Sequence, residues 1–424
     1  MKKITLLLLF MVSQLYSQNF TDHIIDNVTA DALSTKIVDL DGDGDLDIVA
    51  AFYNEPATTN TGKLIWYEND GSQNYTKHDI DTSINGAIYI SILDFNGDGM
   101  KDIALNAYDG NAVYVLPMTN NAPVTFMSKV TIDAAANGSN YSAGADLDGD
   151  SVMDGVSANY GSGELAWYKY TYPTTITKNV IDAAIPQVSS VETGDMDGDG
   201  DIDLVVTGDN QVFWYENQNA TLGTFIKHTI SASNGFTGAI TAYMFDFDED
   251  GDIDIIGSAS GADEVAWFEN NGSQVFTKNV VGTGVDYASF AQAADFNNDG
   301  HIDIIVSATE ADELLLFTND GTDTVFTSTS VGGTLGDAYA LDLNDIDGDG
   351  DMDIALTSPG PNKLRWLENH PYTPVATLAD LRAGTIGERL VLLLEGEMEV
   401  DELKAKIKGL EINPLFVPSS YFKV

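Results

Sequence analysis

The sequence predicts an all-β fold, a seven-bladed β-propeller that is closed by its own N-terminal strand. An acidic nine-residue pattern, first seen at residues 39–47, occurs seven times, with starts 55, 52, 49, 51, 49 and 50 residues apart. Each period also holds four short apolar or β-branched runs with Gly, Asn and Asp turns between them. A fixed period near 50 residues is typical of propellers, solenoids and arrays, and four short strands per period describe one propeller blade.

The runs keep the same order along the array. An apolar run precedes the acidic pattern, as in 89–93, and a β-branched run follows it, as in 202–206. A third run carries an aromatic residue, and a fourth run, such as 75–81, ends most periods. A large ring at one strand position favours packing between blades over the alternative, stacking on a sugar. That position of the third run holds all five tryptophans of the chain, Trp66, Trp167, Trp214, Trp267 and Trp366. In the other two repeats we expect Tyr114 and Leu316 at this position.

The two ends of the array complement each other. The seventh repeat stops after its third run, at residues 367–369, and no fourth run follows it. A fourth run without a preceding unit, residues 20–26, stands at the start of the array. Pairing these two runs would close a ring and would remove two exposed sheet edges. A solenoid would not require a repeat unit that is divided between the two ends of the array. We therefore predict one propeller domain over residues 18–370.

Charge and composition exclude some partners. The chain contains 19 Lys and Arg against 66 Asp and Glu, which gives a formal charge of −47. Nucleic acids and anionic membrane surfaces repel such a chain, so we expect neither as a partner. Its 43% hydrophobic residues are ample for a core, unlike an acidic disordered tail. Because there is no cysteine, disulfides and thiolate metal sites are excluded.

The two ends of the chain differ from the array. Residues 1–17 have a basic start, an apolar run and a polar exit, which indicate a bacterial-type signal peptide and a secreted or cell-surface protein. The apolar run is too short to span a bilayer, and no later segment looks transmembrane. Residues 371–424 are nearly neutral, and their apolar spacing over 388–411 predicts a helix. We assign no role to this C-terminal segment.

The acidic pattern predicts a metal-binding loop. Carboxylates this close repel one another, so the loop should be compact only with a cation inside it. Positions 1, 3, 5 and 9 can offer side-chain oxygens and position 7 a backbone carbonyl, which suits the six to eight oxygen ligands of calcium better than magnesium. The expected ligands of up to seven structural calcium ions are, loop by loop, Asp39, Asp41, Asp43, Asp45 and Asp47; Asp94, Asn96, Asp98, Met100 and Asp102; Asp146, Asp148, Asp150, Val152 and Asp154; Asp195, Asp197, Asp199, Asp201 and Asp203; Asp246, Asp248, Asp250, Asp252 and Asp254; Asp295, Asn297, Asp299, His301 and Asp303; and Asp345, Asp347, Asp349, Asp351 and Asp353.

The acidic loops allow two other interpretations. An EF-hand begins in the same way, but it needs a glutamate at position 12 and flanking helices. Position 12 is Ala50, Leu105 or Val206 in three of the loops, and their flanks are β-branched. The second alternative is a set of solvated acidic turns without an ion, in which the repulsion would go uncompensated.

The loops, the period and the strand order resemble the FG-GAP/VCBS repeat family, which includes the propeller of integrin α-subunits. The resemblance covers most of the chain. It implies that each D-x-[DN]-x-D-G-x-x-D loop joins the first and second strands of a blade and binds calcium through positions 1, 3, 5, 7 and 9. It therefore implies a calcium-stabilised extracellular propeller, but no particular ligand. Two loops depart from the pattern, because Ser151 and Glu249 stand where glycine is usual.

We expect a binding or adhesion module for an extracellular polysaccharide or protein. The turns between second and third strands vary most, and loops on a rigid scaffold commonly carry binding sites. The alternative is a polysaccharide-degrading enzyme, a lyase or hydrolase, on the same scaffold. A pocket that pairs Tyr, Arg or His with carboxylates would favour the enzyme, although no catalytic residue is evident and His23, His78 and His228 recur in the fourth run. Candidate ligand contacts on the variable rim are Tyr53, Glu55, Tyr108, Tyr160, Phe236 and Tyr287.

Overall fold

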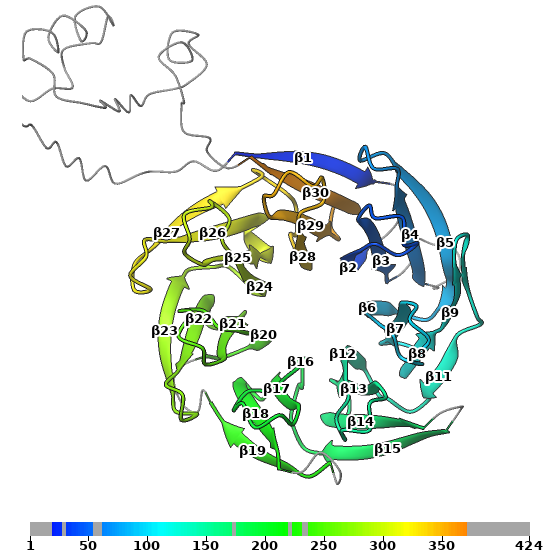
Figure 1. The fold of residues 1–424 in the computed structure, drawn as a ribbon. Coiled ribbons are helices and arrows are strands. Elements are labelled where there is room, and N and C mark those ends of the chain that lie inside the picture. The colour runs from blue at the N-terminus through cyan, green and yellow to red at the C-terminus, as the bar shows by residue number, and fades with distance from the viewer. Residues whose placement is uncertain are drawn as a thin grey trace, which may run out of the picture. The chain divides into compact units, whose positions relative to one another are not determined.

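The computed structural model describes residues 19–27, 31–53, 62–171, 175–218, 223–230 and 236–370. The expected signal peptide, the candidate Glu55 and the segment 371–424 with its expected helix lie outside these residues. Seven four-stranded antiparallel sheets form a ring around a central channel (Figure 1), so the predicted seven-bladed propeller is confirmed. No helix in the described part of the chain is long and apolar enough to cross a membrane.

Each blade runs from an inner first strand to an outer fourth strand. The first strands line the channel: β2 (Ala32–Val38), β6 (Ala87–Leu93), β12 (Ser139–Ala145), β16 (Ser190–Gly194), β20 (Ala239–Phe245), β24 (Ala288–Ala294) and β28 (Leu341–Asn344). The second strands follow: β3 (Asp47–Phe52), β7 (Asp102–Ala107), β13 (Asp154–Asn159), β17 (Asp203–Gly208), β21 (Asp254–Ala259), β25 (Asp303–Ala308) and β29 (Asp353–Ser358).

The third and fourth strands complete the sheets. The third strands are β4 (Gly62–Asn69), β8 (Ala112–Leu116), β14 (Glu164–Thr171), β18 (Gln211–Asn217), β22 (Glu264–Asn270), β26 (Glu313–Asn319) and β30 (Lys363–His370). The fourth strands are β5 (Tyr75–Ile84), β11 (Val130–Asp133), β15 (Thr175–Asp182), β19 (Phe225–Thr229), β23 (Phe276–Thr283), β27 (Phe326–Val331) and β1 (Asn19–Asp26). Blade two adds a hairpin of β9 (Met118–Asn121) and β10 (Val124–Phe126), and a 3₁₀ turn, Thr309–Ala311, precedes β26.

The N-terminal strand closes the ring, as predicted. Strand β1 pairs antiparallel with β30, so the first strand of the chain is the fourth strand of blade seven. The buried Arg365 contacts the Asp22 carboxylate across this pair, and its guanidinium also donates to the carbonyl of Leu335 at 2.8 Å. The closure therefore joins residues more than three hundred positions apart by both backbone and side-chain contacts.

The tryptophan position serves packing. All five indole rings are only 3% to 6% exposed, so they fill the space between sheets and the sugar-stacking alternative is wrong for them. The fourth-strand histidines are structural too. His78, for example, stacks on Trp66 with ring centroids 4.5 Å apart, and its Nε2 lies 2.7 Å from Glu68 Oε2. The same arrangement recurs at His228 and at His23.

The register of blade two corrects one expectation. Val49 pairs with Trp66 in blade one, and the equivalent partner of Ala104 in blade two is Val115. Val115 therefore occupies the tryptophan position, and Tyr114 lies on the opposite face of the strand. A shift of one residue reverses the face because side chains alternate along a strand, so the aromatic character of Tyr114 was misleading. Leu316 does occupy the position, since it pairs with Ile305.

Candidate metal centres and channel cavities

The acidic loops join the first strand of each blade to the second. The position-9 aspartate is the first residue of the second strand in all seven blades. The seven first strands all run in the same direction along the channel, so their acidic loops emerge on one rim of the propeller, which we call the acidic rim. The turns between second and third strands lie on the other rim, which we call the opposite rim.

Backbone amides fold each loop around its own carboxylates. In the fourth loop, Asp195 accepts hydrogen bonds from the N–H groups of Gly198 at 2.8 Å and Gly200 at 3.0 Å. Asp197 accepts one from the N–H of Asp199 at 3.2 Å. Gly198 and Gly200 have φ values of +74° and +94°, a region that L side chains rarely adopt, which explains the glycines of the pattern. The turn therefore directs several carboxylates toward one point.

In five loops, three carboxylates each offer an oxygen within 4.8 Å of the other two. In the second and sixth loops, position 3 is Asn96 or Asn297, whose amide oxygen accepts the N–H of position 5 at 2.9 and 2.8 Å. The amide oxygens thus take the place of the carboxylate oxygens. The five triplets are Asp39, Asp41 and Asp43; Asp146, Asp148 and Asp154; Asp195, Asp197 and Asp199; Asp246, Asp248 and Asp250; and Asp345, Asp347 and Asp353.

An unpartnered oxygen tests whether a cation fits. Asp246 Oδ1 in the fifth loop is buried, and it has no hydrogen-bond partner among the described residues. A buried carboxylate oxygen without a partner is costly, whereas a cation among the carboxylates would satisfy it. These donors are all hard oxygens, which is the set that calcium takes. The residues present therefore fit a calcium ion.

The position-9 aspartates also have a structural role that the sequence analysis missed. Asp47 accepts the N–H of Leu40 at 3.1 Å and the N–H of Asn69 at 2.8 Å, which ties the loop to the third strand. Equivalent pairs of amides reach this carboxylate in five of the other loops. Burial raises the pKa of Asp47 to about 6 and that of Asp353 to about 7.

The position-7 side chains of Asp45 and His301 turn away from the loop centre. A Cβ on Gly71, in the turn between the third and fourth strands, would lie 2.5 Å from Asp45 Oδ2, and a Cβ on Gly321 would lie 2.5 Å from His301 Nε2. These side chains therefore pack over a neighbouring turn. This placement explains why residue types as different as Asp and His are accepted there, whereas Met100 at the same position of the second loop lines the channel cavity.

The third loop differs from the others in its neighbour on the third strand. Lys169 follows Tyr168, which occupies the register of Tyr67, so Lys169 stands where blade one has Glu68. Its ammonium contacts the buried Asp148 carboxylate and lies 3.2 Å from Asp150 Oδ2. Three further blades carry glutamate at this position: Glu216, Glu269 and Glu368.

A glutamate at this strand position adds negative charge beside the acidic loop, whereas Lys169 adds positive charge. Burial, together with the charges of Asp199 and Glu216, raises the pKa of Asp197 in the fourth loop. The third loop instead receives a positive charge at the same place. The lysine compensates part of the loop's charge with a group of the protein itself.

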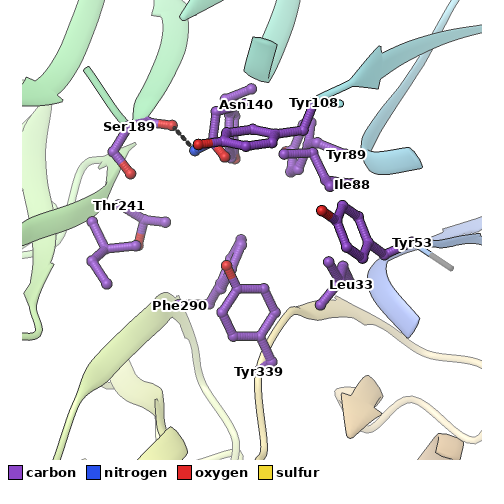
Figure 2. A pocket seen from close by; sticks show the side chains of 12 residues that line it. Leu33, Tyr53, Ile88, Tyr89, Tyr108, Asn140, Ser189, Thr241, Phe290 and Tyr339 are labelled. Carbon is purple, nitrogen blue, oxygen red and sulfur yellow. Dashed lines mark hydrogen bonds between the residues drawn. The ribbon is translucent and has the colours of Figure 1, made fainter. Parts of the chain in front are cut away.

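A small cavity lies at the end of the channel on the opposite rim. It has a volume of about 230 Å³, and its lining includes two sequence candidates, Tyr53 and Tyr108 (Figure 2). Phe236 was a wrong candidate, since it is 1% exposed and packs edge-on against Phe268. Tyr160 and Tyr287 are exposed, but they do not line this cavity.

A larger cavity of about 1020 Å³ occupies the channel toward the acidic rim. Asp94, Lys101 and Asp295 of two acidic loops line its edge. Its other charged residues come from one position, three residues before an acidic loop, which holds Lys36, Glu192 and Asp342 in blades one, four and seven. Lys36 Nζ lies 2.9 Å from Asp342 Oδ1, and the Tyr141 hydroxyl donates to Glu192 at 2.9 Å. This cluster is not evident in the sequence, because only the ring brings these strands together.

Burial sets the protonation of the channel groups. Burial raises the pKa of Glu192 and raises that of Tyr141 well above its usual range. Burial alone would lower the pKa of Lys36, but the Asp342 carboxylate more than offsets this and raises it. At neutral pH the lysine is therefore an ammonium and Tyr141 keeps its proton. Tyr141 stacks on Tyr89 at 3.6 Å, and the two rings line both cavities.

Two solved structures share the fold at low sequence identity, and a third is less similar. Virginiamycin B lyase from Staphylococcus aureus superposes with a TM-score of 0.56 at 11% identity, covering 82% of this chain and 99% of that one. BBS1N, in a complex with ARL6DN, has a TM-score of 0.53 at 12% identity, covering 83% and 96%. A lectin from Agrocybe aegerita that recognises non-reducing terminal N-acetylglucosamine has a TM-score of 0.49 at 16% identity, covering 84% and 86%. No curated protein sequence matches this chain.

The repeats themselves are recognised by a family model. FG-GAP-like repeats match at residues 39–105, 94–157, 146–206, 195–257, 246–306 and 295–356, and each match begins at an acidic loop. The matches span well over half of the chain and include all seven loops. This protein therefore belongs to the FG-GAP-like repeat family.

Proposed function

We propose that this protein is a secreted, calcium-loaded propeller that binds an extracellular polysaccharide or protein. The observation that carries the proposal is the convergence of three carboxylates within 4.8 Å in five of the acidic loops. Two carboxylates at ~4–5 Å repel by roughly 3–4 kcal/mol at an effective dielectric near 20. A divalent cation converts this repulsion into attraction, and the all-oxygen donor set favours calcium. The signal-peptide pattern of residues 1–17 supports secretion.

The calcium has a structural role in this proposal. Extracellular calcium modules bind with Kd values of about 0.1–1 mM, and ion at about ten times Kd stabilises by roughly 1.4 kcal/mol per site. Six such loops would contribute about 8 kcal/mol, which is comparable to the whole net stability of a domain. The third loop is the exception, because Lys169 already compensates Asp148 and Asp150. Calcium therefore replaces the disulfides that this chain lacks.

The channel groups bear on the enzymatic alternative. Glu192 paired with Tyr141 in a concave cavity is the kind of pairing that favours an enzyme. However, Tyr141 and Lys36 hold their protons at neutral pH, and Asp342 is engaged by Lys36. Glu192 is then the carboxylate left to this cluster, since the other two that line the cavity, Asp94 and Asp295, are position-1 residues of acidic loops. Glycoside hydrolysis uses a pair of carboxylates. The cluster is therefore better suited to holding a ligand than to cleaving one.

A retention assay tests the proposal. The mature protein is incubated with acidic and neutral polysaccharides in millimolar calcium and again in EDTA, and both retention and new reducing or unsaturated ends are recorded. Calcium-dependent retention without new ends is expected. New ends that disappear in Glu192→Gln would establish the enzyme instead. The absence of both signals from folded protein would move the ligand from polysaccharides to proteins.

A further inference from the structure

We infer that the cavity on the opposite rim holds one uncharged sugar ring of a glycan. This inference rests on the proposed binding function and names its site and ligand class. The cavity opens at the end of the channel that lies away from the acidic loops. Strands and turns from all seven blades contribute to its wall, so the closed ring is needed to build it.

The first argument is charge. None of the twelve residues that line the cavity is Asp, Glu, Lys, Arg or His. A cavity wall without charged side chains is unusual in a chain with a formal charge of −47. An ion of either sign would find no counter-charge in the wall, and desolvating it there would be costly. The cavity therefore favours an uncharged ligand.

The second argument is the chemistry of the wall. Tyr53, Tyr108 and Tyr339 extend toward the centre of the cavity, and Ser189 and Thr241 lie across from them (Figure 2). Within the described ranges, no residue hydrogen-bonds to the hydroxyl of Tyr108, Tyr339 or Ser189, although these three side chains are only half exposed.

A ligand that is only apolar would cover those hydroxyls without a partner, which is unfavourable. A sugar presents C–H faces to aromatic rings and hydroxyls that both donate and accept. A sugar can therefore contact the aromatic rings and also hydrogen-bond to the hydroxyls of the cavity. A purely aliphatic or aromatic side chain of a protein partner could contact the rings but would leave the hydroxyls without a partner.

The third argument is size and preorganisation. A volume of about 230 Å³ lies below the roughly 300–1,000 Å³ of pockets for drug-sized ligands, which fits a single ring or chain end. The Tyr53 hydroxyl donates to Asp109 at 2.8 Å, and the Asn140 amide donates to the Ser189 carbonyl at 2.8 Å. Two residues of the wall are thus fixed before any ligand arrives. The stacked pair Tyr89 and Tyr141 forms the floor.

The test uses calcium-loaded full-length mature protein and saturation-transfer NMR. The probes are methyl glycosides and short oligomers of glucose, galactose, mannose, xylose and N-acetylglucosamine. Glucuronic acid, galacturonic acid and glucosamine serve as charged counterparts. We expect saturation transfer to at least one neutral probe. Its Kd should rise at least tenfold in Tyr108→Ala and several-fold in Tyr339→Phe, which removes only a hydroxyl.

The control is Val275→Ala, which shortens an exposed side chain in the turn before β23 that does not line the cavity. Its Kd should stay within twofold of the parent protein, and circular dichroism confirms that each variant is folded. Equal or tighter binding of the charged sugars, or no binding of any neutral probe, would overturn the inference. Polysaccharide retention that Tyr108→Ala leaves unchanged would also overturn it, while the proposed binding function would stand.

Discussion

The third and fourth acidic loops differ in one neighbouring side chain that reverses their electrostatics. Both begin with three aspartates in alternate positions, and both place three carboxylate oxygens within 4.8 Å of one another. In the third loop, Lys169 contacts Asp148, whereas the fourth loop has Glu216 at the same strand position. If the loops bind calcium as proposed, we expect that the nine-residue pattern alone does not set the affinity of a loop for the ion. A residue on the third strand would contribute to it.

Removal of divalent ions should separate the two loops most strongly. In EDTA we expect the protein to lose about 8 kcal/mol of stability, from six sites at about 1.4 kcal/mol each. Hydrogen exchange resolves this loss by blade. Amides of β16 and β17, which flank the fourth loop, should lose more protection than those of β12 and β13. Equal loss in the two blades would contradict the comparison.

Lys169→Glu exchanges the electrostatics of the two loops. Without calcium we expect a loss of about 1–3 kcal/mol, because Lys169 is partly exposed while its partner Asp148 is buried. In millimolar calcium the variant should bind one more ion and regain this stability. Lys169→Met is the control, since it removes the positive charge without adding a carboxylate. Chemical denaturation at several calcium concentrations measures both, and a variant insensitive to calcium would refute the role of Lys169.

Truncation of the position-5 aspartate is a matched pair of changes. Asp199 and Asp150 each accept the N–H of position 7 at 2.9 Å, so Asp199→Ala and Asp150→Ala lose the same backbone hydrogen bond. Only Asp199→Ala should also lose a tightly bound ion, at an additional cost of about 1.4 kcal/mol in calcium. Isothermal titration counts the ions. A lower count in Asp150→Ala would place calcium in the third loop as well.

The smallest effect concerns Ser151, which has φ +67° where all six other loops have glycine. Ser151→Gly should relieve this conformation and stabilise the protein by about 1 kcal/mol or less. The number of calcium ions should not change, because the glycine leaves Lys169 in place. An added ion in this variant would assign the difference between the loops to the backbone. Thermal melts and calcium counts together distinguish the two causes.

The repeat period predicted the architecture because every blade has the same four-stranded sheet and packs against its neighbours in the same way. The unpaired run at residues 20–26 predicted the closing strand, and the tryptophans marked the space between sheets. The prediction failed at Tyr114, where the aromatic residue type was used to infer the strand register. It also failed at Phe236, which lies in a turn but is buried in the core. A strand alternates its faces, so residue type cannot fix register by itself.

The channel sites were hidden from the sequence for a different reason. Tyr53, Tyr108 and Tyr339 lie in three blades, and only the curvature of the ring brings them to one cavity. Lys169 is likewise far in sequence from the carboxylates it contacts, nineteen residues after Asp150. Local spacing predicts a ligand set within one loop. Contacts between strands require the pairing register, which the sequence pattern alone did not supply.

The most direct test counts calcium ions by native mass spectrometry, at a free calcium concentration that saturates the tight sites. We predict six ions in the parent protein and seven in Lys169→Glu. Seven equally tight ions in the parent would contradict the role of Lys169. No bound ion in either protein would contradict the central claim that the acidic loops of this propeller are calcium sites.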